Sequence, residues 1–453
     1  MKIAIITLDT FGQRMAGPAI RVWEMATVLS SDHEVEVFTF GAVEREGETF
    51  SLRRTRVEDF RRELGQPDVV IMQGYLIKTF PWLANGNFKL VVDLYDPFHI
   101  ESLQVERFHP MDERIRALDH SLAELNSQVR GGDFFLCASN KQRDLWLGHL
   151  AALGRVNPLT YDDDPQLRRL IDVGSFGIQS TPPSKTRPAI RGIIPGIAHD
   201  DKVIVWGGGV YNWFDPLTVI RAVDRVRETV PNIRLLFMGA KHPNPDVPEM
   251  QMLRDARALS DEMGLTGKHV FFNEEWVEYS DRHNYLLEAD IAVSAHLPGL
   301  ETDFSFRTRM LDYLWAGLPI VATEGDYFAE LIADRGLGRT VPSQNVEAMS
   351  QAFCALLSDD VGCAACAERV SDVAREFHWD KALAALVAYC RDPWEAADRK
   401  LGRREEGTNL IQPTSPSVLV RKALRLAHEH GIRKTIAQGR RYLARNRKRF
   451  TRF

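Results

Sequence analysis

Two series of short apolar runs constrain the fold of this chain more than any other feature. Each run is about five residues long, as is usual for strands buried on both faces of a parallel sheet, and helical patterns separate several of them. The first series is at residues 3–7, 35–40, 68–72, 90–94 and 134–138, and the second at 203–206, 233–238, 269–272, 291–294 and 320–322. The pattern predicts two doubly wound α/β domains. Because open α/β sheets bind ligands at the carboxyl ends of their strands, we expect the chemistry in a cleft between the domains.

The length of the chain and a change in composition support two domains. With 453 residues, the chain exceeds what one hydrophobic core usually serves. Prolines, serines and threonines dilute the apolar pattern between residues 175 and 191, which indicates a linker. We therefore predict an N-terminal Rossmann-like acceptor domain at 1–180, joined by a returning helix at 379–400, and a donor domain at 190–378. A polar connection and a basic helical tail follow at 401–453.

Composition and charge narrow the class of protein. Hydrophobic residues make up 44% and charged residues 26%, which is typical of a globular chain. The five cysteines are scattered and odd in number, so we expect reduced thiols rather than a disulfide framework. The start, MKIAIITLDT, leads directly into a strand pattern without a cleavage site, so we expect a cytoplasmic protein.

The net charge of −5 is unevenly distributed along the chain. Residues 417–453 contain twelve Lys or Arg and one acid, Glu429, so this tail carries +11 and the rest carries −16. Apolar residues interleave with the cations, which favours an interfacial helix on anionic lipid at the inner membrane face. A solvated tail is the alternative. We predict no nucleic-acid partner, because no nucleic-acid-binding motif accompanies the charge.

The segment FSFRTRMLDYLWAGLPIVATEGD, residues 304–326, combines a turn, a helix and a buried strand. Arg307 and Arg309 fall in the first turns of the predicted helix. There the free backbone N–H groups and the helix dipole favour an anion, and a guanidinium adds bidentate bonds to phosphate oxygens. Solvated helix charges are the equally weighted alternative.

Three glycines follow the first strand of the second domain. Gly207, Gly208 and Gly209 would let backbone N–H groups approach a phosphate without an intervening Cβ, although a tight turn would also explain them. Trp213 would offer a nucleobase or sugar an aromatic face, and core packing is the commoner use of such a ring.

Two further groups of candidates lie in the first domain. Asp96 and His99 follow a strand end, where a carboxylate and an imidazole would orient a reacting hydroxyl. Gly17 and Pro18 lie between the first strand and a helix that carries Arg21, and Pro18 suits the first turn of that helix. This loop would contact phosphates or the acceptor, or form only a connection. The acidic run at 162–164 is assigned to solvent or helix capping, so no metal ligand is predicted.

The stretch LDYLWAGLPIVATEGD resembles the second half of the signature of family 4 (group 1) retaining glycosyltransferases, which have the two-domain GT-B fold. Asp312 stands where that signature has its second glutamate. Phe304 stands in place of the first glutamate, so the acid near the sugar is either Glu301 or Asp303, or it is absent. Gly209 and Phe214 stand where the family has a phosphate-binding arginine and lysine, and we expect Arg307 and Arg309 to replace them.

The resemblance implies transfer of a sugar from a nucleotide diphosphate donor to a glycan or lipid-linked acceptor, with retention and without an obligatory metal or other cofactor. Such a transferase would act in cell-surface or exopolysaccharide biosynthesis. Catalysis is assigned to Asp96, His99, Arg307 and Arg309. The remaining assignments for donor binding are Gly207, Gly208, Gly209, Trp213, Glu301, Asp303, Ser305 and Asp312. The alternatives are a nucleotide-sugar epimerase of the same fold and a non-catalytic nucleotide-sugar-binding relative.

Overall fold

The computed structural model describes residues 1–13, 15–239, 249–275 and 277–399. Contacts divide the chain into the units Met1–Gly407 and Thr408–Phe453, and every described residue belongs to the first. The predicted basic tail lies outside the described residues.

The first domain is built on a parallel sheet with the strand order β3-β2-β1-β4-β5-β6-β7. Its strands are β1 Lys2–Thr7, β2 Glu34–Thr39, β3 Ser51–Arg54, β4 Val69–Met72, β5 Lys89–Asp93, β6 Phe134–Cys137 and β7 Ile171–Val173. The helices between them are α1 Gly17–Leu29, α2 Phe60–Leu64, the 3-10 turn Pro81–Asn85, α3 Phe98–Val105, α4 Met111–Gly131, α5 Asn140–Ala152 and α6 Pro158–Asp163.

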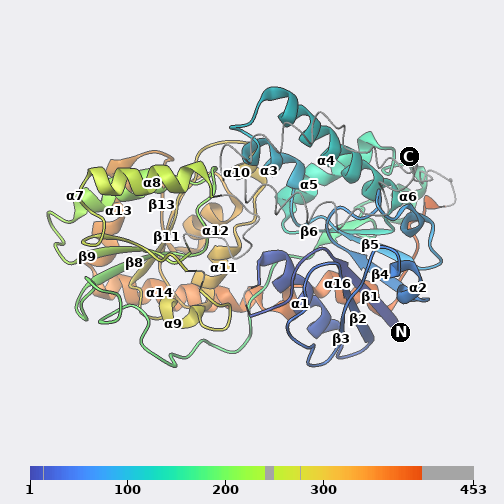
Figure 1. Cartoon of the computed structure of the whole chain (residues 1–453), viewed down its shortest axis with the longest axis horizontal. Coiled ribbons are helices and arrows are strands. Elements are labelled where there is room, and N and C mark those ends of the chain that lie inside the picture. Colours follow the sequence, from blue (N-terminus) through green and yellow to red (C-terminus); the bar gives the residue numbers. More distant parts are fainter. Residues whose placement is uncertain (14, 240–248, 276, 400–453) are drawn as a thin grey trace, which may run out of the picture. The chain divides into compact units, whose positions relative to one another are not determined.

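The second domain repeats this plan with the parallel order β10-β9-β8-β11-β12-β13. Its strands are β8 Lys202–Trp206, β9 Ile233–Phe237, β10 Val270–Phe272, β11 Ile291–Ser294, β12 Ile320–Thr323 and β13 Gly338–Val341. Its helices are α7 Pro216–Val226, α8 Gln251–Glu262, α9 Arg282–Leu286, α10 Leu300–Phe304, α11 Thr308–Trp315, α12 Tyr327–Arg335, α13 Val346–Leu357 and α14 Asp360–Ala374. In Figure 1, α8 and α14 lie on opposite sides of this sheet.

The predicted fold class, two doubly wound parallel sheets, is confirmed. All ten apolar runs form strands, and three further strands lack such a run. β3 (SLRR) is a largely exposed edge strand, β7 (IDV) has only three residues, and β13 (GRTV) holds a single branched apolar residue. An edge or very short strand needs no continuous apolar run, because only part of its surface is buried.

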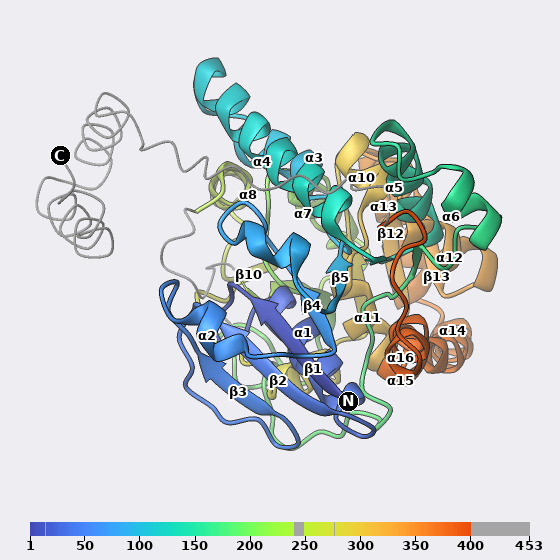
Figure 2. The same cartoon turned by 90° about the vertical axis from the view of Figure 1, so that its right-hand side faces the viewer.

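Alternate residues of β1 pack into two different hydrophobic clusters. In β1, Ile3 and Ile5 join one cluster, which α1 covers, while Ala4 and Ile6 join another with residues of α2, α4 and α5. Figure 2 shows α4 on the other side of the first sheet from α16 (Ala384–Arg391). This period of two is what a strand buried on both faces produces.

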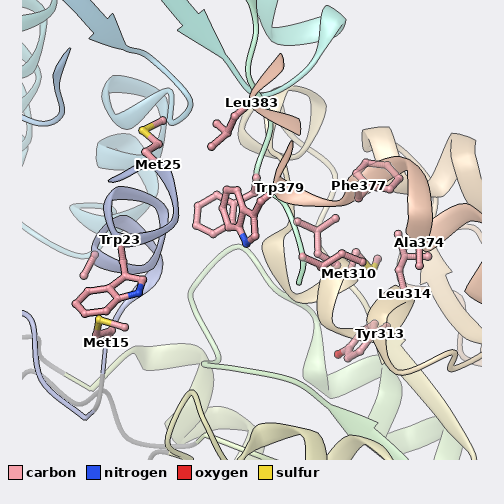
Figure 3. Close-up of a cluster of buried hydrophobic side chains, with 14 of the residues drawn as sticks. Met15, Trp23, Met25, Met310, Tyr313, Leu314, Ala374, Phe377, Trp379 and Leu383 are labelled. Carbon is pink, nitrogen blue, oxygen red and sulfur yellow. The ribbon is translucent and has the colours of Figure 1, made fainter. Parts of the chain in front are cut away.

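One of these clusters continues from the first domain into the second. It includes residues of α1, among them Trp23 and Met25, and residues of α11, among them Met310 and Leu314. Trp379 lies between the two groups, as Figure 3 shows. The two domains therefore share an apolar core on one face of each sheet.

The two connections between the domains are bonded to each other. The Ile178 N–H donates to the Phe377 carbonyl at 2.8 Å, and the Trp379 N–H donates to the Ile178 carbonyl at 3.1 Å. A Cβ atom on Gly177 would lie 2.7 Å from the indole of Trp379, so only glycine permits this packing. We call residues 176–179 and 377–379 the hinge pair.

The chain returns to the first domain after the hinge pair through α15 Trp379–Ala382 and α16 Ala384–Arg391. The Tyr389 ring stacks on Phe134 of β6, with centroids 4.6 Å apart. Beyond α16, the buried Asp398 carboxylate pairs with Arg155 through bonds of 2.8 and 3.0 Å. A buried ion pair therefore attaches the end of the described chain to the first domain.

Replacing Asp398 by Ala would leave the Arg155 guanidinium buried without its counter-charge. We expect the free energy of unfolding to fall by roughly 3–5 kcal/mol, as when one partner of a buried pair is removed. Urea unfolding followed by circular dichroism measures it. Asp392→Ala, at an exposed position, is the matched control, with an expected change within about 0.5 kcal/mol. Equal effects of the two variants would contradict a structural role for the Arg155–Asp398 pair.

Candidate active site between the domains

A cavity of about 220 Å³ lies between the two domains, and we call it the central cavity. Residues from both domains line it: Met15, Ala16, Gly17, Ile20, Phe176, Gly177, Gly207, Gly208, Gly209, Tyr211, Met238, Gly239, Val277, Tyr279, Arg282, Leu286, Thr308, Arg309, Leu311 and Asp312. The start of α1 thus faces the glycine loop that follows β8 and the first turns of α11. This is the region where parallel sheets bind ligands.

Tyr313 of α11 holds the glycine loop, residues 207–209, in place. The Gly207 N–H donates to the Tyr313 hydroxyl at 2.7 Å, and this hydroxyl donates to the Val293 carbonyl at 3.0 Å. A Cβ atom on Gly207 would lie 3.0 Å from the Tyr313 ring, and Gly208 has a φ of 74°. Position 208 therefore favours glycine because of its left-handed backbone, and position 207 leaves little room for a side chain beside Tyr313.

Arg309 brings a buried cation to the wall of the central cavity. Its Nη2 donates to the Gly209 carbonyl at 2.7 Å, and its guanidinium lies 4.0 Å from the Phe214 ring centroid. Its Nη1 is buried and has no hydrogen-bond partner among the described residues. Burial lowers the pKa of Arg309 to about 10, so the side chain stays cationic at neutral pH. Because Arg309 lines the cavity, an anion there would lie close to a positive charge.

Asp312 lies on the cavity wall one helical turn after Arg309. Its Oδ1 accepts a bond of 2.8 Å from Arg282 Nε, and the carboxylate remains about one-third exposed. Arg282 in turn packs over the Tyr279 ring at 3.6 Å. The Asp312 carboxylate is therefore oriented and still accessible to a hydroxyl donor.

Arg307 does not line the central cavity, although we predicted it beside Arg309. Its Nη1 and Nη2 donate to the two carboxylate oxygens of Glu301 at 2.7 and 2.6 Å, and both residues are buried. Arg307 Nε also lies 3.9 Å from Asp326 Oδ2. The carboxylates of Glu301 and Asp326 neutralise the Arg307 guanidinium, so Arg307 and Glu301 pair with each other rather than with a ligand.

Three further donor-binding candidates, Asp303, Ser305 and Trp213, also lie outside the lining of the central cavity. Asp303 is exposed, and the Ser305 hydroxyl donates to the Thr302 carbonyl at 3.0 Å. Trp213 stacks on Tyr211 with centroids 4.9 Å apart, and it is Tyr211 that reaches the cavity.

Asp96 and His99 occupy a neighbouring region of the domain boundary. Asp96 hydrogen-bonds to Glu101 of α3, and burial, together with the Glu301 charge, raises the pKa of Asp96 to about 7. The His99 ring lies 5.5 Å from the Trp146 ring, and burial lowers the pKa of His99 to about 4. Helix α3 contacts α10. These two groups are thus close to the second domain but do not line the central cavity.

Not all of the three candidates at the start of α1 line the central cavity. Gly17 lines the cavity, and Pro18 occupies the first turn of α1. Arg21 is fully buried, because both carboxylate oxygens of Asp93 and the carbonyls of Gly174 and Ser175 accept its N–H groups. Arg21 therefore joins α1 to β5 rather than binding a phosphate.

Sequence reasoning did not assign Arg282 or Tyr313 to the site. Both act through partners distant in sequence, Asp312 and the glycine loop. Tyr313 stands inside the stretch LDYLWAGLPIVATEGD, but its bond to the glycine loop cannot be read from that stretch. The acidic run at 162–164 forms local contacts, in which Asp163 pairs with Arg169 and Asp164 accepts the Gln166 N–H. Among the described residues, no group of acids, histidines and cysteines is arranged to hold a metal ion.

Comparison with known proteins gives three consistent findings. Residues 201–359 match the family described as glycosyl transferases group 1. WaaG, a glycosyltransferase involved in lipopolysaccharide biosynthesis, aligns over 88% of this chain and 99% of its own, with 17% identity and a TM-score of 0.60. HepE of Anabaena, solved in complex with UDP-glucose, aligns over 87% of this chain and all of its own, with 14% identity and a TM-score of 0.60.

The described chain has the GT-B fold. A curated relative, the phosphatidyl-myo-inositol mannosyltransferase of Mycolicibacterium smegmatis, is 26% identical over 144 residues, which is 31% of this chain and 36% of that enzyme. The matched family and WaaG are described as glycosyltransferases and this relative as a mannosyltransferase, which supports an enzyme of the glycosyltransferase class. No helix of the described residues is long and apolar enough to cross a membrane.

Different outcomes are expected when the two arginines at the start of α11, Arg307 at its N-cap and Arg309 in its first turn, are replaced. Arg307→Ala leaves Glu301 buried without its partner, and we expect a loss of roughly 3–5 kcal/mol in the free energy of unfolding. Arg309→Ala removes a donor from the central cavity, and we expect nucleoside diphosphate affinity to fall about 10- to 150-fold, as for a hydrogen bond to a charged group.

Urea unfolding and calorimetric titration with UDP and GDP measure the two effects. Arg335→Ala, which removes an exposed pair with Glu376, is the control for both. Normal nucleotide affinity in the Arg309 variant would remove Arg309 from the site.

Proposed function

We propose that this chain is a glycosyltransferase that moves a sugar from a nucleotide diphosphate donor to a glycan or lipid-linked acceptor. The observation that carries the proposal is the buried Arg309 guanidinium, which lines the central cavity beside the glycine loop and has no carboxylate partner among the described residues. The group 1 family match over the same domain and the UDP-glucose complex of HepE support a nucleotide-sugar donor.

The geometry suits the charge changes of glycosyl transfer. When the bond between the sugar and the diphosphate breaks, negative charge develops on the diphosphate. Arg309 and the free backbone N–H groups at the start of α11 would stabilise this charge in a largely buried site. The glycine loop and the Arg309 guanidinium are held in position before the donor binds, because Tyr313 bonds to the loop and the Phe214 ring packs against the guanidinium.

We further propose that transfer proceeds with retention and without an obligatory metal. In this scheme an oxygen of the departing diphosphate accepts the proton of the incoming hydroxyl, and the hydroxyl oxygen forms the new bond on the same face of the sugar. The cationic surroundings of the diphosphate would take the role that a divalent ion has in other transferases. WaaG's part in lipopolysaccharide biosynthesis supports a cell-surface glycan as the product.

Incubation of the full chain with nucleotide sugars tests the activity. We expect free nucleoside diphosphate to be released faster when an acceptor glycan is added, and EDTA to leave the rate unchanged. Arg309→Ala should lower turnover about 10²- to 10³-fold, as when one donor to a developing oxyanion is lost. Isomerised donor without release would favour an epimerase, and no heat on titration with UDP or GDP would favour a non-catalytic relative.

The basic segment at 417–453, which lies outside the described residues, is proposed to attach the enzyme to anionic membranes. Its +11 charge follows from the sequence alone. Deleting residues 417–453 should abolish sedimentation with vesicles that contain phosphatidylglycerol, while transfer to a soluble acceptor persists. Unchanged sedimentation of the truncated chain would end this proposal.

A further inference from the structure

A second cavity adjoins the central one, and we call it the side groove. It has a volume of about 490 Å³, and its lining includes Trp23, Glu24, Gln179, Tyr279, Arg282 and Trp315. Met15, Tyr279 and Arg282 line both cavities. The side groove therefore borders the central cavity, and residues of α1 and of the linker between the domains line it.

The central cavity is too small for a whole nucleotide sugar. Its volume of about 220 Å³ falls below the range of roughly 300–1,000 Å³ that is usual for small-molecule sites. Part of the donor must extend beyond it. Arg309 places the diphosphate near the glycine loop, and the accessible Asp312 carboxylate lies one turn further along α11, where it would accept hydroxyl protons of a ribose. The donor's nucleoside end would then point toward Arg282 and the side groove.

The walls of the side groove suit an aromatic base. The Arg282 guanidinium lies 3.6 Å from the Tyr279 ring centroid and 4.6 Å from that of Trp315, which holds these side chains as one rigid surface. Its bond to Asp312 joins this surface to the central cavity. Bases stack well on aromatic and guanidinium planes, because every base has a π-face.

Glu24 gives the side groove a specific hydrogen-bond acceptor. This residue of α1 is half-buried and hydrogen-bonds to Gln179, which leaves acceptor capacity on its carboxylate. Burial raises the pKa of Glu24 to about 7, and the Glu48 charge adds to this effect, while Arg282, the Gln179 bond and Arg45 oppose it. The guanidinium of Arg45 packs on the Trp23 ring at 3.6 Å.

The pattern of donors on each base decides which one fits a carboxylate. Guanine presents two adjacent N–H donors on its Watson–Crick edge, which match the two oxygens of one carboxylate. Uracil presents a single N–H between two carbonyl groups, and these would face the Glu24 charge unfavourably. Adenine presents one amino donor beside a ring acceptor.

We propose that the side groove holds the nucleobase of the donor and that Glu24 selects guanine. This inference rests on the proposed function, because it needs a nucleotide diphosphate in the central cavity. It adds the identity of the base and assigns the choice to a residue of the first domain. Donor binding would then engage both domains at once.

Calorimetric titration of the full chain with GDP, UDP and ADP tests the selection. We expect GDP to bind most tightly, and Glu24→Gln to weaken GDP about 10- to 150-fold while UDP affinity changes less than twofold. The substitution keeps the volume and a hydrogen-bonding group, so folding should be preserved. Glu46→Gln, an exposed neighbour outside the groove, is the matched control.

A pH series separates recognition from a structural effect. Only the ionised Glu24 accepts both donors of guanine, so GDP affinity should rise between pH 6 and pH 8, through the pKa of about 7. UDP carries the same diphosphate and reports the phosphate's own titration. The excess rise for GDP over UDP should vanish in Glu24→Gln.

Three results would overturn the inference while leaving the proposed function intact. The first is tighter binding of UDP or ADP than of GDP. The second is an equal loss of affinity for GDP and for UDP in Glu24→Gln. The third is an excess pH dependence of GDP affinity over UDP affinity that survives in this variant. Absence of binding by all three nucleotides would instead overturn the proposed function itself, and the inference with it.

Discussion

The apolar packing around Trp379 is the constraint on which the site depends. This side chain lies where the two connections between the domains run side by side, and the cluster around it continues from α1 to α11. Those two helices carry opposite walls of the central cavity. A shared core fixes their separation more firmly than polar contacts at the rim would, because closely packed side chains leave little room for adjustment. Gly177 is part of the same constraint, since a Cβ there would meet the indole.

Buried ion pairs decide which charged residues remain available for a ligand. Asp93 neutralises Arg21, and Glu301 neutralises Arg307, so each of these arginines has its counter-charge within its own domain. Arg309 differs because aromatic rings and a backbone carbonyl surround it, and the described residues offer it no carboxylate partner. Burying a cation without a counter-ion is costly, and this cost is offset when an anionic ligand binds. Such an arrangement is typical of a functional site rather than of a structural one.

Much of the architecture could be predicted from the sequence because it depends on local patterns. Short apolar runs marked ten strands, and Pro18 marked the start of α1. The exposed strand β3 and the very short β7 could not be found in this way, because their pairing rather than their composition makes them strands. Of the predicted site residues, the glycine loop, Gly17, Arg309 and Asp312 meet in the central cavity, while Asp96, His99 and Arg307 lie outside its lining.

By itself, the sequence determined the two parallel sheets, the glycine loop after the first strand of the second domain, and a helix with two arginines near its start. Only the tertiary structure decided which arginine faces the cavity, because that choice depends on Glu301 and Asp326 reaching Arg307 from other elements. It also brought Glu24 of the first domain beside Arg282 and Tyr279 of the second. Periodicity reports which face of an element is buried, whereas the partner of a charge depends on residues that come together only when the chain folds.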